Sequence, residues 1–243
     1  TDNHYVALVA RLNLARLQTQ RGHLRRADEM LRHALGAAEA MGMDQLPVTG
    51  LLSIELGSIL VEWNALDEAV ALLEKGAELI ARGEDVTAMQ MGHAFMARAL
   101  FAQGDVDGVQ DLVQRMEYLA EETAMSGWIH YWIVALRLQI YLARDDLASA
   151  ARLAEEIGLS VDEAPTYVRE MAYSPLIQLY IAQGRPEATM GLLARLLQAA
   201  EDAGRWGRVI ATLALRASAL TVQGDVDAAL ADLARALSIA EAE

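Results

Sequence analysis

The sequence contains no cysteine, so it offers neither a disulfide framework nor thiolate chemistry, and a reducing compartment is allowed. Aromatic residues are also scarce, at 5% of 243 residues, although hydrophobic residues reach 54%. The apolar content is therefore mostly Ala, Leu, Val, Ile and Met, which is typical of closely packed helices. The most apolar segment, residues 128–143, is interrupted by His130 and Arg137, and no apolar run approaches the ~18 to 20 residues that a membrane span needs. We expect no membrane segment.

Positive charge is in short supply, because 20 Lys and Arg residues stand against 34 Asp and Glu, for a formal net charge of −14. Contacts with nucleic-acid phosphates need clustered Lys and Arg, so we expect no direct nucleic-acid binding by this segment. The acidic excess is better explained as keeping an alanine-rich surface soluble. Residues 1–4 contain neither an initiator Met nor a signal-peptide pattern, and we interpret the segment as part of a longer protein.

Groups for catalysis or metal binding are lacking as well. The five histidines include no pair at zinc-ligand spacing with an acidic third ligand, so we interpret them as surface or partly buried polar residues and expect no metal site. The sequence has no nucleophile elbow, no acid–base constellation and no phosphate-binding glycine loop. We therefore predict that this segment is not an enzyme and holds no cofactor of its own.

What the sequence does contain is a repeat, since the pentapeptide QGDVD occupies residues 103–107 and again 223–227. One interpretation is a calcium loop, which needs a glutamate at the twelfth position counted from the first aspartate, but Met116 and Ala236 stand there. The other interpretation is a helix end followed by a helix start, with the glycine in a left-handed conformation and the first aspartate as an N-cap. We favour the second interpretation.

Four further turns align with the two glycines of the pentapeptide. The six anchor positions are Gly22, Asn64, Gly104, Asp145, Gly184 and Gly224, at spacings of 42, 40, 41, 39 and 40 residues. Gly, Asn and Asp are the residue types that tolerate a left-handed helix end. Apolar residues recur five and nine positions after the anchors, as the buried face of a second helix requires. The sequence thus predicts an all-α, right-handed solenoid of six helical hairpins that forms one domain over residues 1–243, with no β-sheet.

Two places depart from the regular pattern. The second helix of the fourth repeat should be short and end near Gly158, and Pro175 should begin or kink the first helix of the fifth repeat. The last helix keeps a full apolar stripe at Ala229, Leu233, Leu237 and Ala240. Because a terminal repeat usually turns a polar face outward, we expect this stripe to be incompletely covered and a chain extended beyond Glu243 to be more stable.

Small residues at the contact between the two helices of a repeat, together with the Gly-x-x-x-x-Ala helix end, resemble the tetratricopeptide repeat, whose usual period is about 34 residues. Three segments, in their order and spacing, resemble more particularly the sensor region of MalT-like, ATP-dependent transcriptional activators that end in a LuxR-type helix-turn-helix. These segments are residues 60–69, 158–162 and 182–188. The resemblance spans nearly the whole chain.

The resemblance implies a regulatory module between a nucleotide-binding switch and a DNA-binding domain in a bacterial, cytoplasmic protein. ATP is then expected on a separate domain of the full-length protein, where ATP and an inducer promote self-association before promoter binding. The implied partner of this segment is a small-molecule effector or a regulatory protein. The alternative function is a free-standing tetratricopeptide-type scaffold that binds a peptide or a partner protein.

Candidate binding residues form a polar column, with one aromatic neighbour, along the first helices of the repeats. They are Arg16, Ser58, Arg98, Trp132, Gln139, Gln178 and Ser218. In tetratricopeptide-like solenoids this part of the first helix faces the concave groove, so the column resembles a ligand-facing stripe, although a merely hydrated helix face has the same pattern. Trp132 lies two turns before Gln139 on the same face and can stack on a ligand or pack in the core. We expect the helices of Arg98 and Gln139 to lie side by side, roughly 8 to 10 Å apart.

Overall fold

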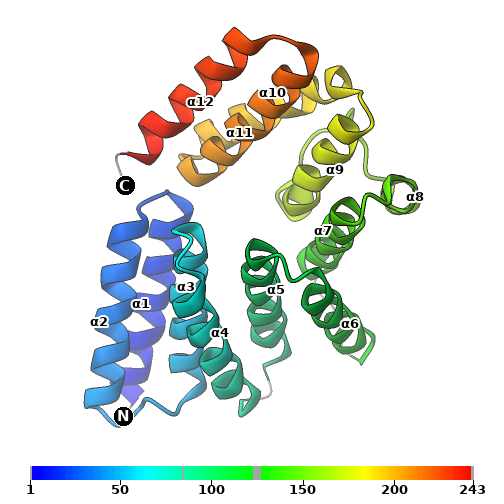
Figure 1. Ribbon diagram of the computed structural model, residues 1–243. Coiled ribbons are helices and arrows are strands. Elements are labelled where there is room, and N and C mark those ends of the chain that lie inside the picture. Colours follow the sequence, from blue (N-terminus) through cyan, green and yellow to red (C-terminus); the bar gives the residue numbers. More distant parts are fainter. Residues whose placement is uncertain (1, 84, 123–126, 242–243) are drawn as a thin grey trace. The chain divides into compact units, whose positions relative to one another are not determined.

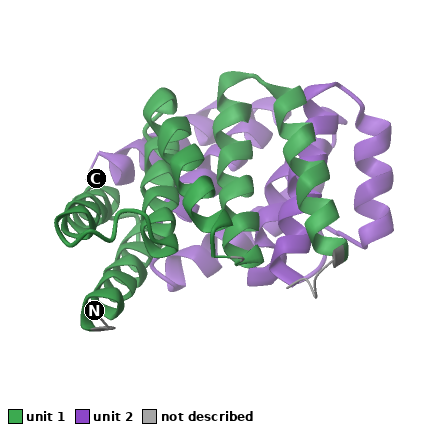
Figure 2. Cartoon of the chain, turned by 90° about the horizontal axis from the view of Figure 1, so that it is seen from below, with its two compact units in different colours: residues 1–125 green, residues 126–243 purple. Residues whose placement is uncertain are grey.

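The computed structural model describes residues 2–83, 85–122 and 127–241. These residues form twelve α-helices and two short 3-10 helices, and no strand occurs among them. The predicted all-α fold of six helical hairpins is confirmed. Contacts between residues divide the chain into two compact units, residues 1–125 and 126–243 (Figure 2). Each unit holds three hairpins and is described by itself, so one continuous right-handed domain stays a prediction.

Unit 1 is built around its third helix. Its helices are α1 (Asp2–Gln20), α2 (Leu24–Ala40), α3 (Pro47–Glu62), α4 (Leu66–Ala81), α5 (Val86–Gln103) and α6 (Val106–Glu122). Helix α3 packs against α1, α2, α4 and α5 (Figure 1). From Val48 to Leu60 only Leu51 is not fully buried, because this helix is apolar around its whole circumference and neighbours cover every side.

Unit 2 contains the less regular repeats. Its elements are α7 (Gly127–Ala143), α8 (Leu147–Ile157), the 3-10 turn η1 (Tyr167–Arg169), α9 (Glu170–Ala182), the 3-10 turn η2 (Pro186–Thr189), α10 (Met190–Asp202), α11 (Trp206–Gln223) and α12 (Val226–Ala240). The first helices of its repeats lie side by side, since α7 packs on α9 and α9 on α11 (Figure 1). Its main core gathers residues from α7 to α11 around the fully buried Tyr173.

The predicted helix ends are confirmed at all six anchors. Each anchor residue has a positive φ, between 56° at Asp145 and 85° at Gly22 and Gly224. At each anchor the following residue donates its backbone N–H to the carbonyl oxygen five positions earlier, as Asp105 does to Leu100 at 2.9 Å. This is the six-to-one hydrogen bond of a Schellman helix end, and it explains why only Gly, Asn and Asp occupy the column.

The two aspartates of the pentapeptide are N-caps, as predicted. The Asp105 side chain accepts a hydrogen bond from the backbone N–H of Gly108 at 2.9 Å, and Asp225 accepts one from Ala228 at 3.2 Å. Asp146 caps α8 in the same way through Ser149. The repeated pentapeptide is therefore a local device that ends one helix and starts the next.

The irregular fifth repeat differs in part from what the sequence predicts. The second helix of the fourth repeat is short and ends at Gly158, as predicted. Pro175, however, does not begin a helix, because α9 starts at Glu170 and contains the proline in its interior. Because proline has no backbone N–H, the helix lacks one backbone hydrogen bond at this position. The prediction that Pro175 begins the helix is wrong, and the alternative, that it kinks the helix, stays a prediction.

Asp145 offers a test of the helix-end interpretation. It is exposed and has a φ of 56°, a conformation that costs a residue with a Cβ more than it costs glycine. We expect Asp145→Gly to raise the free energy of unfolding by roughly 0.5 kcal/mol in thermal or urea denaturation. Ala71→Gly, an exposed change inside α4, is the control and should lower stability. Equal destabilisation by both changes would contradict the interpretation.

Candidate functional site

Arg16, one of the candidate binding residues in unit 1, pairs with a buried carboxylate that sequence reasoning missed. Arg16 of α1 places its Nε 2.5 Å from Oε1 of Glu55 on α3, whose side chain is only 8% exposed. The Arg16 guanidinium also lies 3.9 Å from the sulfur of Met91 on α5. Burial raises the pKa of Glu55, and the charge and hydrogen bond of Arg16 oppose that rise. Arg16 thus connects three helices of the unit.

Ser58 does not present its hydroxyl to solvent. It is 5% exposed, and its Oγ donates to the backbone carbonyl oxygen of Glu55 at 2.8 Å. The expectation that the whole polar column faces a groove is therefore wrong at this position, because α3 is covered on every side. A serine inside an apolar helix often satisfies its hydroxyl on the preceding turn in this way.

Arg98 is the candidate in unit 1 that remains accessible. Its Nη2 lies 2.5 Å from Oε1 of Glu62, with side chains 36% and 45% exposed, so the pair joins α5 to the end of α3 at the surface. Gln139 belongs to unit 2, and the predicted proximity of the Arg98 and Gln139 helices therefore stays a prediction.

Within unit 2 the remaining candidates stand on three helices that lie side by side. Gln139 on α7 is partly buried, whereas Gln178 on α9 and Ser218 on α11 are exposed. Ser218 donates its hydroxyl to the carbonyl oxygen of Ala214 at 3.0 Å. Trp132 is partly buried and meets Trp128 edge to face, with ring centroids 5.2 Å apart. Adjacent helices thus bring equivalent polar positions of unit 2 into one row.

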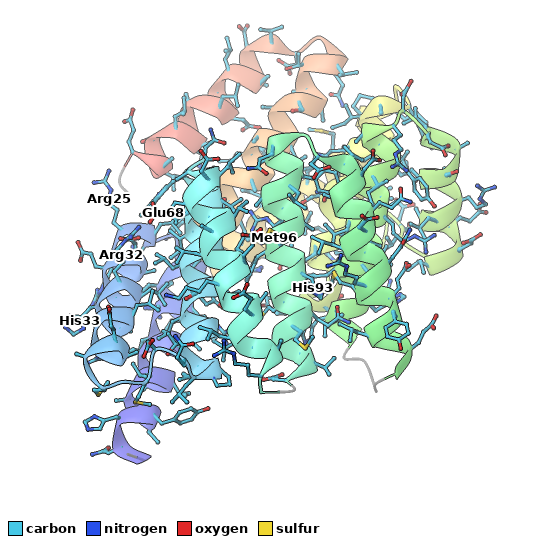
Figure 3. The ribbon with its side chains drawn as sticks, turned by 60° about the horizontal axis from the view of Figure 1, so that its bottom comes forward. Arg25, Arg32, His33, Glu68, His93 and Met96 are labelled. Carbon is cyan, nitrogen blue, oxygen red and sulfur yellow. The ribbon has the colours of Figure 1, made fainter. Side chains whose placement is uncertain are left out.

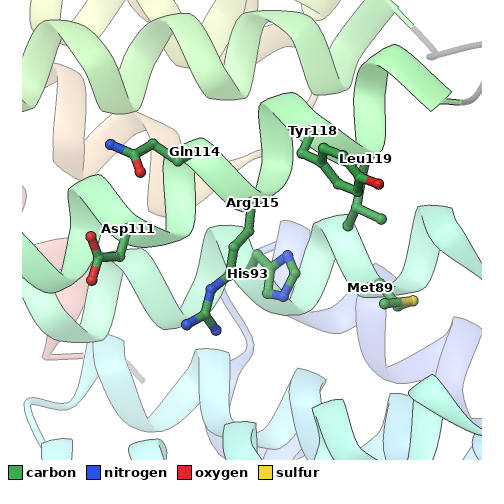
Figure 4. A pocket seen from close by; sticks show the side chains of 7 residues that line it. All are labelled: Met89, His93, Asp111, Gln114, Arg115, Tyr118 and Leu119. Carbon is green, nitrogen blue, oxygen red and sulfur yellow. The ribbon is translucent and has the colours of Figure 1, made fainter.

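A hollow of about 520 Å³ opens between α5 and α6 in unit 1 (Figure 4). Figure 4 shows the ring of His93 beside the guanidinium of Arg115. The Nδ1 atom of His93 is buried and makes no hydrogen bond with the described residues. Burial, and then the charge of Arg115, lowers the pKa of His93. The apolar Met89 and Leu119, the exposed Tyr118, and the polar Asp111 and Gln114 complete the lining.

The loop after α8 is fixed by a second polar cluster. The Oε2 atom of Glu163 lies 2.6 Å from Nη1 of Arg169, and the hydroxyl of Tyr173 donates to its Oε1 at 3.4 Å. Arg169 also stacks over the ring of Tyr131, at 5.3 Å from the centroid. Burial and the charge of Glu163 raise the pKa of Tyr173. Every group has a partner, so this cluster holds the loop in place rather than offering a reactive side chain.

The described residues contain no group of three or more His, Cys, Asp or Glu side chains that could hold a metal ion. No helix in the described part of the chain is both long and apolar enough to cross a membrane.

Comparison with models of known protein families shows to which family the chain belongs. The family model described as MalT-like TPR region matches residues 1–243. The chain belongs to this family. The resemblance that three short segments indicated is therefore confirmed, and the six hairpins are the repeats of a MalT-like TPR region.

Curated relatives of this MalT-like TPR region are much longer proteins. The HTH-type transcriptional regulator MalT of Yersinia pestis (strain Pestoides F) is 31% identical over 118 residues, which are 49% of this chain and 13% of that protein. The protein of the same name from Yersinia enterocolitica serotype O:8 / biotype 1B is 30% identical over 118 residues. Among solved structures, a Podosopora anserina protein with nearly identical TPR-like repeats has a TM-score of 0.42 at 19% identity, covering 97% of this chain and 95% of that one.

Proposed function

We propose that this MalT-like TPR region is the sensor and protein-interaction module of a bacterial transcriptional activator. It binds a small-molecule effector or a regulatory protein, and it couples that binding to self-association of the full-length protein and to transcription control. The family match over residues 1–243 carries the proposal, and the curated relatives are HTH-type transcriptional regulators. In this proposal the chain catalyses no reaction and works in the cytoplasm, while ATP and promoter DNA bind other domains.

In this proposal the accessible members of the polar column, taken separately in each unit, form the effector wall of that unit. Arg98 offers a guanidinium at the surface of unit 1. In unit 2, Gln178 and Ser218 offer exposed donors and acceptors on the adjacent helices α9 and α11. Trp132 and Gln139, both partly buried on α7, add an indole for stacking and an amide. Binding sites combine apolar surface with a few placed polar groups, and the row on α7, α9 and α11 of unit 2 supplies both.

Arg98→Ala, combined with Gln139→Ala, tests the effector wall. The Arg98 ion pair is solvent-exposed, so Arg98→Ala should change the free energy of unfolding by no more than ~0.5 kcal/mol. The double variant should nevertheless weaken the response of a transcriptional reporter to effector in the complete regulator. A double variant that unfolds the chain would make these residues structural, and one that responds normally would place the effector elsewhere.

Arg32→Ala is the matched control for this test. Arg32 of α2 pairs across the surface with Glu68 of α4 at 3.0 Å, and its side chain is 47% exposed (Figure 3). Arg32→Ala removes a surface guanidinium that pairs with Glu68 and with Asp28, and Arg32 lies on the second helix of its repeat, outside the polar column. The reporter response should therefore match that of the unmodified regulator.

The runner-up function is a free-standing scaffold for a peptide or partner protein. The hollow between α5 and α6 favours it, because Tyr118 stands 61% exposed at its rim and tyrosine is enriched where proteins meet. The reading frame that encodes this chain separates the two functions. A frame without a helix-turn-helix would overturn the transcription proposal and leave the scaffold.

A further inference from the structure

The hollow between α5 and α6 holds two basic groups without a counter-charge. The guanidinium of Arg115 lies beside the ring of His93 (Figure 4), and it makes no ion pair with any residue that the structure describes. Burial, and then the charge of Arg115, lowers the pKa of His93, so the two groups repel each other whenever the ring is protonated. A negative charge placed between them removes that repulsion.

His93 has one ring nitrogen that can donate a hydrogen bond to a ligand. Its Nδ1 atom is buried and has no hydrogen-bond partner among the described residues. A buried N–H without an acceptor is costly, so the neutral ring carries its proton on Nε2. The protonated ring carries a proton on Nε2 as well. Because the side chain lines the hollow, Nε2 offers an N–H there in both states.

The hollow is particular to the third hairpin and does not follow from repeat packing. Its lining residues Met89, His93 and Leu119 are all partly exposed. Forty residues earlier, at the equivalent positions of the second hairpin, stand residues no more than 3% exposed: Thr49, Ser53 and Leu79. The second hairpin therefore closes the seam that the third leaves open.

The lining changes in character along the hollow. Figure 4 shows two polar side chains, Asp111 and Gln114, on one side of Arg115. On the other side lie the apolar and aromatic residues: Met89, Tyr118 and Leu119. A ligand that reaches the basic pair from this second side gains apolar contact and stays away from the carboxylate of Asp111.

We propose that the hollow binds a small organic anion, whose carboxylate or phosphate oxygens accept hydrogen bonds from Arg115 and from Nε2 of His93. The apolar part of the ligand lies on the apolar and aromatic side of the hollow. Hydrogen bonds between a guanidinium and an oxyanion are charge-assisted and are among the stronger ones in proteins. A volume of about 520 Å³ lies within the range of small-molecule sites, which favours such a ligand over a partner protein.

This site is separate from the effector wall of unit 1. Arg98 follows His93 by five residues, so the two side chains leave α5 about 140° apart around its axis. Arg98 pairs with Glu62 of α3, whereas His93 lines the hollow beside α6. A ligand in the hollow therefore leaves Arg98 uncovered, and the inference does not depend on the proposed function.

Titration of the 243-residue chain with three related probes tests the site. Phenylacetate supplies the carboxylate, phenyl phosphate supplies the phosphate, and phenylacetamide is the neutral counterpart. The chain has five histidines, so the NMR signal of the His93 ring, assigned by its loss in His93→Gln, has four internal controls. The His93 signal should shift and saturate with an anionic probe between about 0.1 and 50 mM, while the other four stay in place. Whether the carboxylate or the phosphate binds more tightly identifies the oxyanion.

Three variants show whether the charges of the hollow are responsible. Arg115→Gln should weaken binding of the anionic probe by at least about tenfold in calorimetric titration, and the residue is exposed, so the fold should be kept, as circular dichroism would verify. Asp111→Asn should tighten binding by about two- to fivefold, because it removes a repelling charge. Lys75→Gln is the matched control, since Lys75 is exposed at the equivalent position of α4, and it should bind normally.

The inference is overturned if neither anionic probe saturates the His93 signal, and a partner protein would then be the better occupant of the hollow. Binding of phenylacetamide as tight as that of phenylacetate would also overturn it, because the hollow would then select apolar surface alone. So would equal losses of affinity in Arg115→Gln and Lys75→Gln, since the anions would then respond to the overall charge of the chain.

Discussion

Arg16→Met is expected to lower the free energy of unfolding by about 3 kcal/mol at a pH where Glu55 is ionised. The side chain of Glu55 is only 8% exposed, and Arg16 is its one ion-pair partner among the described residues. Removing the guanidinium leaves a carboxylate in an apolar interior, where it must remain charged without a partner or take up a proton. Methionine matches arginine in helix propensity, so the loss reports on the ion pair and not on α1 itself. Urea denaturation followed by circular dichroism measures it.

The effect should depend on pH in a defined direction. Burial already raises the pKa of Glu55 above its ordinary value of 4.5, so the folded chain binds more protons than the unfolded chain above that pH. Stability from this group is therefore present at low pH and is lost as the pH rises through the folded pKa. Without Arg16 the pKa rises further, because the charge and hydrogen bond that lowered it are gone. The destabilisation should be small below the ordinary pKa of the carboxyl group and should grow as the pH rises above it.

Two variants make this prediction specific. Arg32→Met removes a guanidinium whose side chain is 47% exposed, and it should cost less than about 1 kcal/mol both below and above the ordinary pKa of Glu55. Arg16→Met combined with Glu55→Leu replaces the pair by apolar groups and should recover most of the stability. If Arg16→Met were no more harmful than Arg32→Met at a pH where Glu55 is ionised, the ion pair would not be what holds α1 on α3.

Sequence reasoning reached the repeat architecture because the anchors depend on local chemistry. A residue such as Gly104 or Asn64 is needed wherever the backbone turns left-handed, and that need is visible in one chain. Ala69 of α4 is buried where α4 packs on α3, and its position follows from the same repeat spacing. These features involve residues close in sequence, so their spacing alone predicts them.

The polar contacts were harder to predict because they join residues far apart in the chain. Arg16 and Glu55 are 39 residues apart, and their pairing depends on how α1 and α3 rotate against each other. The sequence indicated this ion pair only through Glu55, the single charged residue in the mostly apolar segment 46–61. Ser58 was misjudged for the same reason, since its column position predicts a groove while the packing of four helices around α3 buries it.

Gly76→Ala should lower the free energy of unfolding by about 2 kcal/mol, although alanine is the better helix former. Gly76 of α4 lies where the backbones of α3 and α4 approach each other closely. A Cβ at this residue would stand 2.8 Å from the carbonyl oxygen of Gly50 and 2.7 Å from Cγ1 of Ile54. A side chain can rotate away, but the carbonyl belongs to a helix that is packed on every side, so α3 and α4 must separate.

Gly36→Ala is the matched control for that change. Gly36 is exposed in α2, and a Cβ there would meet no atom within 4 Å. The same substitution should therefore raise stability by up to about 1 kcal/mol, which gives the two variants opposite signs in urea denaturation. If both glycines behaved alike, the close approach of α3 and α4 would have no energetic consequence.

Gly50→Ala extends the argument, because the Cβ it adds would lie 2.7 Å from the carbonyl oxygen of Gly76. Each methyl group alone forces the same separation of α3 from α4. Once the helices have moved for the first, the second should cost less, so the double variant should lose less stability than the two single losses added together. Strictly additive losses would mean that each methyl is accommodated locally, and the paired glycines would then not set the spacing of the two helices.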